Sequence, residues 1–392
     1  MEFSFYIRII DLIRSFYLRE HRDKKLTSIN YEESVNMKSN MKSDMKSNEK
    51  EHKELVKELN ENINSSFKRK SKKKKIIGIT LGSIVAIIII AGLGFSYFFG
   101  YQVAYGLLYQ NEGLDTKGNS VKQLAEWNYN EEEYERTNFE KNNNGREFTV
   151  AAKDGNIIYG THFIRDNKLD NNTVILIHGL GGDRVCMEPI AKMYLEQGWN
   201  VITFDQRASG DSKNEWVTFG YFEKYDVEAL VDYVKELTSD KKIVIHGQSM
   251  GAVTAGLYAA TKHASEHVYA VIMDSPFDSM ESMFLGVWHE MEGADGIPDD
   301  YIIWCGDWYL RWNYKFSFAD TDLVNLSKKN HVKSLVIESM RDDVALPEMN
   351  EAIYEAIATE DKELWRVDAE HVKGFVDFPE EYTKAVMEFL QK

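Results

Sequence analysis

Cysteine is scarce in this sequence, which contains two, Cys186 and Cys305, among its 392 residues. These two residues match no metal-ligand spacing. They also cannot supply the disulfide framework that holds small secreted modules together. We expect two free buried thiols, with a single disulfide between them as the alternative, and we expect no metal site.

Basic residues are in short supply beyond the first hundred positions. Residues 1–99 hold 19 of the 47 Lys and Arg and 12 of the 63 Asp and Glu, a net charge of +7, which leaves −23 for the remainder. Such an acidic body argues against nucleic-acid binding. The Gly-rich segment at 179–182 has neither a G-x-G-x-x-G pattern nor a Walker lysine. We therefore expect no phosphate-bearing cofactor.

The composition of the N-terminal region indicates a basic tail. The unit Met-Lys-Ser-Asn/Asp occurs three times between Met37 and Asn48, a low complexity that is typical of disorder. Residues 1–20 place apolar side chains at helical spacing, which fits either a helix on a membrane surface or a short helix of no special role. We predict a cytoplasmic, basic and disordered tail over residues 1–75.

A membrane-length apolar run follows the tail. Ile76 to Phe99 is 24 residues without a charge. As a helix it would extend about 36 Å, enough to cross a hydrocarbon core of about 30 Å. Seven basic residues lie between Lys68 and Lys75, and the first charge after the run is Glu112. The positive-inside rule then predicts a single-pass anchor at 76–99 in the cell membrane, with the rest of the chain outside. A cleaved signal peptide fits poorly, because the run is long and begins after residue 75.

After a predicted stalk at 100–146, short apolar runs alternate with helical patterns. Strand-like runs lie at 148–150, 157–159, 173–177, 200–204, 269–273, 335–337 and 363–367, and helical patterns separate most of them. This alternation predicts a parallel sheet with right-handed crossovers.

One further strand runs directly into a catalytic motif. The β-branched run from Ile243 leads into Gly-x-Ser-x-Gly at 247–251, and small residues at helical spacing follow. Strand, sharp turn and helix form the context in which this pentapeptide indicates a nucleophile elbow. The glycines allow a turn too tight for side chains. The helix N-terminus favours negative charge developing near the Ser249 hydroxyl.

The order of these features resembles a known superfamily. Along the chain come a His-Gly loop at 178–179, Asp-Gln-Arg at 205–207, the elbow, Asp-Ser-Pro at 274–276, an acidic loop at 338–343 and a late histidine. From roughly Glu147 to Lys392 this order resembles the α/β-hydrolase superfamily. Within it, the chain is similar to bacterial membrane-anchored or secreted serine hydrolases related to the serine aminopeptidase group. The resemblance implies an α/β-hydrolase fold over 147–392, with a mostly parallel sheet flanked by helices and a helical cap at about 278–330.

The resemblance also implies a catalytic triad in the order Ser, Asp, His. His371 lies between the last strand and the final helix, where the family's base is found. The family's usual His-Gly-x-x-Asp maps without a gap onto the segment that ends at Asp342, although its His-Gly is missing here. Pro347 comes one residue later than the family's usual proline, which favours Asp343. We predict Asp342 as the triad acid and keep Asp343 as the alternative.

The resemblance also implies the two residues of the oxyanion hole. The backbone N–H groups of Leu180 and Met250 are expected to form the oxyanion hole. Independently of the resemblance, we expect Asp205, Arg207 and Asp211 to brace loops rather than to react. The cap region is rich in aromatic residues, which line either a substrate pocket or a small core of the cap itself: Phe284, Trp288, Trp304, Trp308, Tyr309, Trp312, Tyr314 and Phe316.

The sequence thus predicts a membrane-anchored serine hydrolase that cleaves carboxylic esters of small molecules through an acyl-enzyme. A short-peptide or amide substrate is one alternative. The other is a catalytically silent surface binding module, which the missing His-Gly favours.

Overall fold

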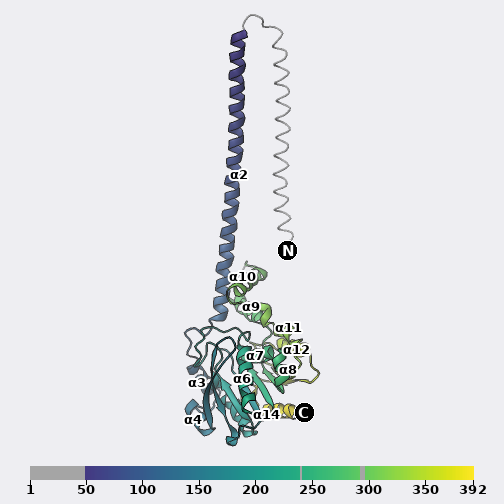
Figure 1. Cartoon of the computed structure of the whole chain (residues 1–392). Helices are drawn as coiled ribbons and strands as arrows, with labels where there is room; N and C mark the ends of the chain where they lie inside the picture. Colours follow the sequence, from purple (N-terminus) through teal and green to yellow (C-terminus); the bar gives the residue numbers. More distant parts are fainter. Residues whose placement is uncertain (1–48, 239–240, 292–295) are drawn as a thin grey trace. The chain divides into compact units, whose positions relative to one another are not determined.

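A computed structural model describes residues 49–238, 241–291 and 296–392, and the chain divides into two units, Met1–Ala91 and Gly92–Lys392 (Figure 1). The helical pattern predicted at 1–20 and the repeat at 37–48 lie outside the described residues. In the first unit, every described residue belongs to helix α2 (Glu49–Leu108), so residues 49–75 of the predicted tail are helical. The helix is long and apolar enough to be a membrane-span candidate, and its apolar window is not covered by protein.

The second unit is built on one sheet of eight strands in the order β1-β2-β4-β3-β5-β6-β7-β8. β1 pairs antiparallel with β2 and β2 with β4, whereas all other neighbours run parallel. The mostly parallel sheet is therefore confirmed. The strands are β1 (Gly145–Ala151), β2 (Ile157–Phe163), β3 (Thr173–Ile177), β4 (Asn200–Phe204), β5 (Ile243–Gln248), β6 (Ala270–Asp274), β7 (Lys333–Ser339) and β8 (Lys362–Val367).

Helices cover both faces of the sheet. Successive side chains of a strand point to opposite faces, so the apolar strands present side chains on both faces for helices to bury. In β3, Ile175 and Ile177 join one buried cluster and Val174 and Leu176 the other. The flanking helices are α5 (Glu188–Glu196), α6 (Glu223–Leu237), α7 (Met250–Ala259), α8 (Lys262–His267), α12 (Pro347–Ala356), α13 (Gly374–Asp377) and α14 (Pro379–Gln391). The first cluster includes residues of α6 and α7, and the second includes residues of α5 and α14.

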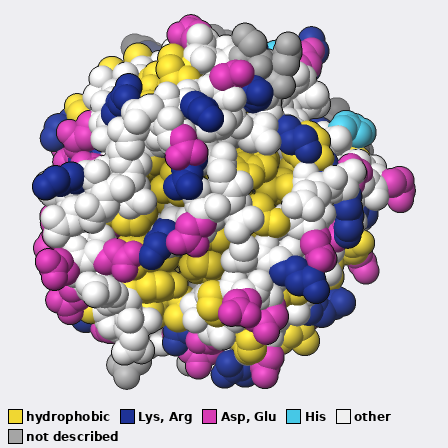
Figure 2. All heavy atoms as spheres, turned by 90° about the horizontal axis from the view of Figure 1, so that it is seen from below, with side chains coloured by type: hydrophobic (Ala, Val, Ile, Leu, Met, Phe, Trp, Pro, Cys, Tyr) yellow, Lys and Arg dark blue, Asp and Glu magenta, His cyan; other side chains and the backbone are white. Residues whose placement is uncertain are grey.

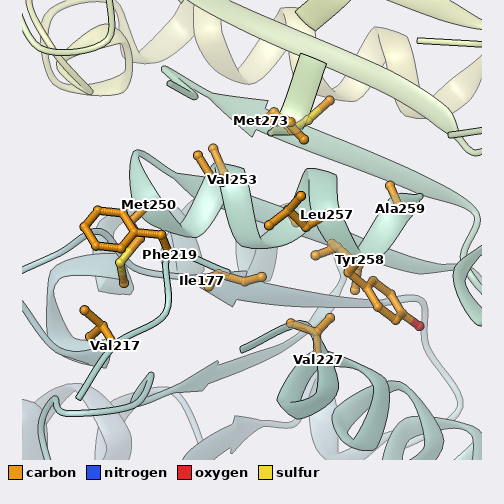
Figure 3. Packing of buried hydrophobic residues seen from close by; sticks show 14 of the residues in the cluster. Ile177, Val217, Phe219, Val227, Met250, Val253, Leu257, Tyr258, Ala259 and Met273 are labelled. Atoms are coloured by element: carbon orange, nitrogen blue, oxygen red, sulfur yellow. The ribbon is translucent and has the colours of Figure 1, made fainter. Parts of the chain in front are cut away.

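Helix α7 lies at the centre of the first cluster. All ten of its residues are buried, including Val253 and Leu257. Figure 3 shows these side chains among Ile177, Phe219 and Met273. A helix apolar on every side belongs in a core, and this packing fixes the position of the helix that begins immediately after Ser249.

The cap lies between β6 and β7, where the sequence predicts it. It contains α9 (Met280–Glu290), α10 (Asp299–Asn313), the 3₁₀ turn η3 (Phe318–Thr321) and α11 (Leu323–Ser327). Cys186 and Cys305 are both free and buried, as expected.

Residues 100–146, predicted as a stalk, fold onto the sheet-containing unit. The end of α2 contributes Val103 and Leu107 to the first cluster. Helices α3 (Thr116–Glu126) and α4 (Arg136–Asn142) contribute Leu124 and Phe139 to the second. On the face seen in Figure 2, acidic and basic side chains are intermingled around a central area of hydrophobic ones.

Candidate active site

The strand–turn–helix around Ser249 has the geometry of a nucleophile elbow. Ser249 adopts φ 54° and ψ −121°, between the end of β5 and the start of α7. A non-glycine residue in this region is strained, and such strain is concentrated at functional sites. A Cβ on Gly247 would meet the backbone of Gly251, and a Cβ on Gly251 would meet the carbonyl of Ile177. Both glycines are therefore required by close backbone approach.

Three predicted residues from distant parts of the chain meet at this turn. Ser249 Oγ lies 2.9 Å from His371 Nε2, and His371 Nδ1 lies 2.7 Å from Asp342 Oδ2. The carboxylate of Asp342 is buried, and the imidazole is 19% exposed. The structure thus joins a hydroxyl, an imidazole and a carboxylate in one hydrogen-bonded series.

The loop after β7 places Asp342 rather than Asp343 against the histidine. Asp342 Oδ1 accepts the N–H groups of Val344 and Ala345, at 2.9 and 2.8 Å, so the carboxylate cannot turn freely. Asp343 is exposed. Glu338, at the position of the family's usual histidine, is buried and accepts a hydrogen bond from Arg366 Nε at 3.0 Å. The missing His-Gly therefore does not displace the acid.

The loop after β3 approaches the serine closely. A Cβ built on Gly179 would lie 3.4 Å from the Ser249 Cβ. Among the residues that the structure describes, none accepts a hydrogen bond from the N–H of Leu180 or of Met250. His178 braces the loop, since its Nε2 accepts the Gln206 N–H at 3.0 Å. Burial lowers the pKa of His178, which keeps this ring neutral.

A buried network behind the serine was not foreseen from the sequence. Asp274 Oδ2 accepts hydrogen bonds from Gln248 Nε2 at 2.8 Å and from the Tyr382 hydroxyl at 2.9 Å. The same hydroxyl lies 2.9 Å from His246 Nε2. Burial raises the pKa of Asp274 to about 6 and lowers that of His246 to about 3. The Ser249 N–H also donates to the Asp274 carbonyl at 2.9 Å, so this network holds the backbone of the elbow.

Helix α3 holds the loop after β3 from outside the sheet. The buried Ser120 hydroxyl accepts the Asp183 N–H at 2.8 Å, and Asn119 Nδ2 donates to the Gly181 carbonyl at 3.1 Å. Gly181 and Asp183, which make these contacts, follow Leu180 closely in the chain. The sequence showed α3 only as a weak helix in a stalk, because polar residues such as Ser120 carry no signal of their distant partners.

The loop after β4 is held by hydrogen bonds and ion pairs, in agreement with the expected bracing role of Asp205 and Arg207. Asp205 accepts the N–H groups of Arg184 and Asp211, at 3.1 and 2.8 Å. Arg207 pairs with Asp226 at 2.8 Å. Ala208 in the same loop takes a left-handed conformation with φ 56°.

One cavity of the sheet-containing unit lies away from the serine. A cavity of about 630 Å³ is lined by residues of α5, α13, α14 and the connection between α3 and α4. None of Ser249, Asp342 or His371 lines it. In the cap, Tyr309 and Phe316 are buried as parts of its core, whereas Trp304, Trp308 and Trp312 are exposed.

Comparisons with known proteins agree with this architecture. Residues 172–375 match the model of the alpha/beta hydrolase fold family. The uncharacterized protein YqkD of Bacillus subtilis is 27% identical over 244 residues, which cover 62% of this chain and 78% of that protein. A probable lysophospholipase L2 of Haemophilus influenzae is 25% identical over 30% of this chain and 38% of its own length. The esterase Pf2001 of Pyrococcus furiosus superposes with a TM-score of 0.52 at 25% identity, covering 64% of this chain and 94% of the esterase.

Proposed function

The chain belongs to the alpha/beta hydrolase fold family, and from this membership and the site geometry we propose that it is a serine hydrolase that cleaves carboxylic esters. The observation that carries the proposal is the Ser249–His371–Asp342 series, with distances of 2.9 and 2.7 Å at a strained elbow. The fold likeness to an esterase supports the same substrate class.

In the proposed reaction Ser249 is the nucleophile. His371 Nε2 removes the hydroxyl proton as Oγ attacks the ester carbonyl, and the Asp342 carboxylate stabilises the imidazolium that forms. The protonated ring then donates its proton to the departing alcohol, which leaves an acyl group on Oγ. A water molecule, deprotonated by the same ring, attacks the acyl-enzyme and releases the carboxylic acid.

The negative charge on the carbonyl oxygen needs donors that are already in place. The Leu180 and Met250 N–H groups are the proposed pair. Both lack a partner among the described residues, and Met250 opens helix α7. One such donor typically contributes a factor of about 10² to 10³ in rate. The helix N-terminus adds a favourable electrostatic potential.

We place the enzyme at the cell membrane, anchored by residues 76–99, with the tail at 1–75 cytoplasmic and the domain at 147–392 outside. The uncovered apolar surface of α2 and the basic residues before it support this arrangement. Protease added to intact cells should then remove the catalytic domain, and its protection would contradict the topology.

The test of the chemistry uses the full chain in detergent micelles. We expect labelling by a fluorophosphonate probe and turnover of p-nitrophenyl esters, and the chain length that is cleaved fastest would size the acyl site. Ser249→Ala should abolish both signals, whereas Ser265→Ala, at an exposed serine of α8, should leave both unchanged.

Two alternatives have distinct outcomes. Labelling without ester turnover would favour a short-peptide or amide substrate, as the resemblance to serine aminopeptidases suggests. Neither labelling nor turnover would favour a catalytically silent binding module.

A further inference from the structure

Three tryptophans of the cap form an exposed row on α10. Trp304, Trp308 and Trp312 are 46%, 39% and 68% exposed. Their spacing of four residues places them on one face of the helix, while Tyr309 and Leu310 of the same helix are buried. They therefore neither fill the core of the cap nor line an enclosed pocket. A soluble protein rarely leaves so much aromatic surface uncovered.

Helix α10, which carries this row, lies beside the C-terminal end of α2 (Figure 1). The Ser96 and Tyr301 hydroxyls are 2.8 Å apart, and the Tyr97 and Trp308 rings meet edge to face with centroids 6.0 Å apart. A Cβ on Gly100 would lie 2.8 Å from the Tyr309 Cβ, so the two helices are in backbone-close contact. The tryptophan row is therefore fixed relative to this end of α2.

The same end of α2 carries exposed tyrosines near the close of the uncharged run. Tyr97 lies within the run at 76–99, and Tyr101 and Tyr105 follow it; all three are exposed. At 1.5 Å per residue, Tyr105 is about 9 Å beyond Phe99 along the helix. The headgroup region of a bilayer extends a comparable distance, roughly 5 to 8 Å, from the edge of its hydrocarbon core.

The chemistry of this surface matches that depth. Tryptophan and tyrosine are enriched where hydrocarbon meets headgroups, because their rings are apolar and their N–H or O–H groups stay hydrated. The charges nearest the row on α10, Asp307 and Arg311, form an ion pair at 2.6 Å, so the helix presents little net charge there.

We propose that the face formed by Trp304, Trp308, Trp312 and Tyr97 docks the cap onto the bilayer that α2 crosses, at its phospholipid headgroups. This inference rests on the proposed membrane anchor and does not depend on the proposed catalysis. It gives the cap a fixed orientation against the lipid and brings the catalytic unit to the source of lipid esters. The rival occupant of the face is a second copy of the chain.

Tryptophan fluorescence can test the docking directly, because α2 contains no tryptophan. The full chain is reconstituted in nanodiscs of phosphatidylcholine, either plain or with bromine at acyl carbons 6 and 7, near the headgroups. We expect the brominated lipid to quench the wild-type emission. A variant with Trp304→Gln, Trp308→Gln and Trp312→Gln should lose more than half of that quenching, and Trp127→Phe, at a half-buried residue outside the cap, should keep it.

Each other outcome overturns the proposal. Equal quenching of the triple variant and the wild type would mean that other residues face the lipid. No quenching of the wild type, or failure of the full chain to enter nanodiscs, would remove the docking or the anchor. Two copies per nanodisc at limiting protein, lost in the triple variant, would assign the face to dimerisation.

Two controls accompany the measurement. The emission of Ser249→Ala should be quenched as much as that of the wild type, so a failure of the proposed chemistry is distinguishable from a failure of the docking. Circular dichroism checks that each variant is folded.

Discussion

Replacing Asp342 by asparagine should remove most of the activity while leaving the fold intact. Asp342 Oδ1 accepts two backbone N–H groups, from Val344 and Ala345, so an asparagine would keep its carbonyl oxygen there. Its amide NH₂ would then face His371 Nδ1, now 2.7 Å from the carboxylate. That nitrogen would have to become an acceptor, which puts the ring proton on Nε2, the atom that must take the proton of Ser249.

The magnitude follows from this tautomer change. In serine hydrolases with the same arrangement the loss is about 10⁴-fold in rate, and at about 1.36 kcal/mol per factor of ten this is about 5 kcal/mol of transition-state stabilisation. The cost in folding should be smaller, because one charge-assisted hydrogen bond contributes about 1.5 to 3 kcal/mol.

The assay is kcat/KM for the best p-nitrophenyl ester, measured on the full chain, with thermal unfolding as the check on folding. Asp343→Asn is the matched control, since this neighbouring carboxylate is exposed, and we expect it to stay within about twofold of the wild type. More than a tenth of the activity left in Asp342→Asn, or an equal loss in Asp343→Asn, would refute the assignment of the acid.

Three further predictions concern one buried histidine of β2 and two residues that support the site. Burial lowers the pKa of His162 to about 4, below its unfolded value of about 6.5, so the unfolded state binds more protons at this residue as pH falls. His162 alone should therefore contribute about 2 kcal/mol to the loss of stability between pH 7 and pH 5, and denaturant titrations of His162→Leu at the two pH values should show a loss smaller by that amount. Gly251→Ala should prevent formation of the elbow, because its Cβ would meet the Ile177 carbonyl, and soluble folded protein with wild-type kcat would contradict this. Ser120→Ala leaves the buried Asp183 N–H without its acceptor, so we expect kcat to fall about tenfold with KM little changed; an unchanged kcat would mean that α3 does not position the loop after β3.

Much of the architecture was predictable because its signals are local. The buried strands β3 and β4 begin and end at the residues that their apolar runs indicate, and Gly-x-Ser-x-Gly predicts the elbow at which Ser249 adopts its strained φ. The choice of His371 needed the family's order of residues, since a lone histidine has no distinguishing pattern. The geometry then brings it next to Ser249.

The parts that escaped prediction depend on contacts between distant residues. Tyr382 lies 108 positions from Asp274 along the chain, and nothing in the sequence near either residue indicates their hydrogen bond. Helix α3 read as part of a stalk because its role lies in polar contacts to Gly181 and Asp183, which hydrophobic periodicity does not record. The aromatic composition of the cap predicts a pocket or a core and does not indicate an exposed row, because composition does not tell which way a side chain points.

The order of the sheet has a consequence for how the enzyme is made. Ser249 leaves the ribosome 122 residues before His371, and β8, at the edge of the sheet, must pair with β7 before the loop that carries the histidine can close. Contacts between residues so far apart form late, because the chain between them must first be ordered. The serine therefore emerges as an ordinary alcohol and gains its reactivity only when the last strand joins the sheet. If the proposed anchor places synthesis beside a membrane, this order keeps the nascent chain from attacking the esters of its lipids before it is folded.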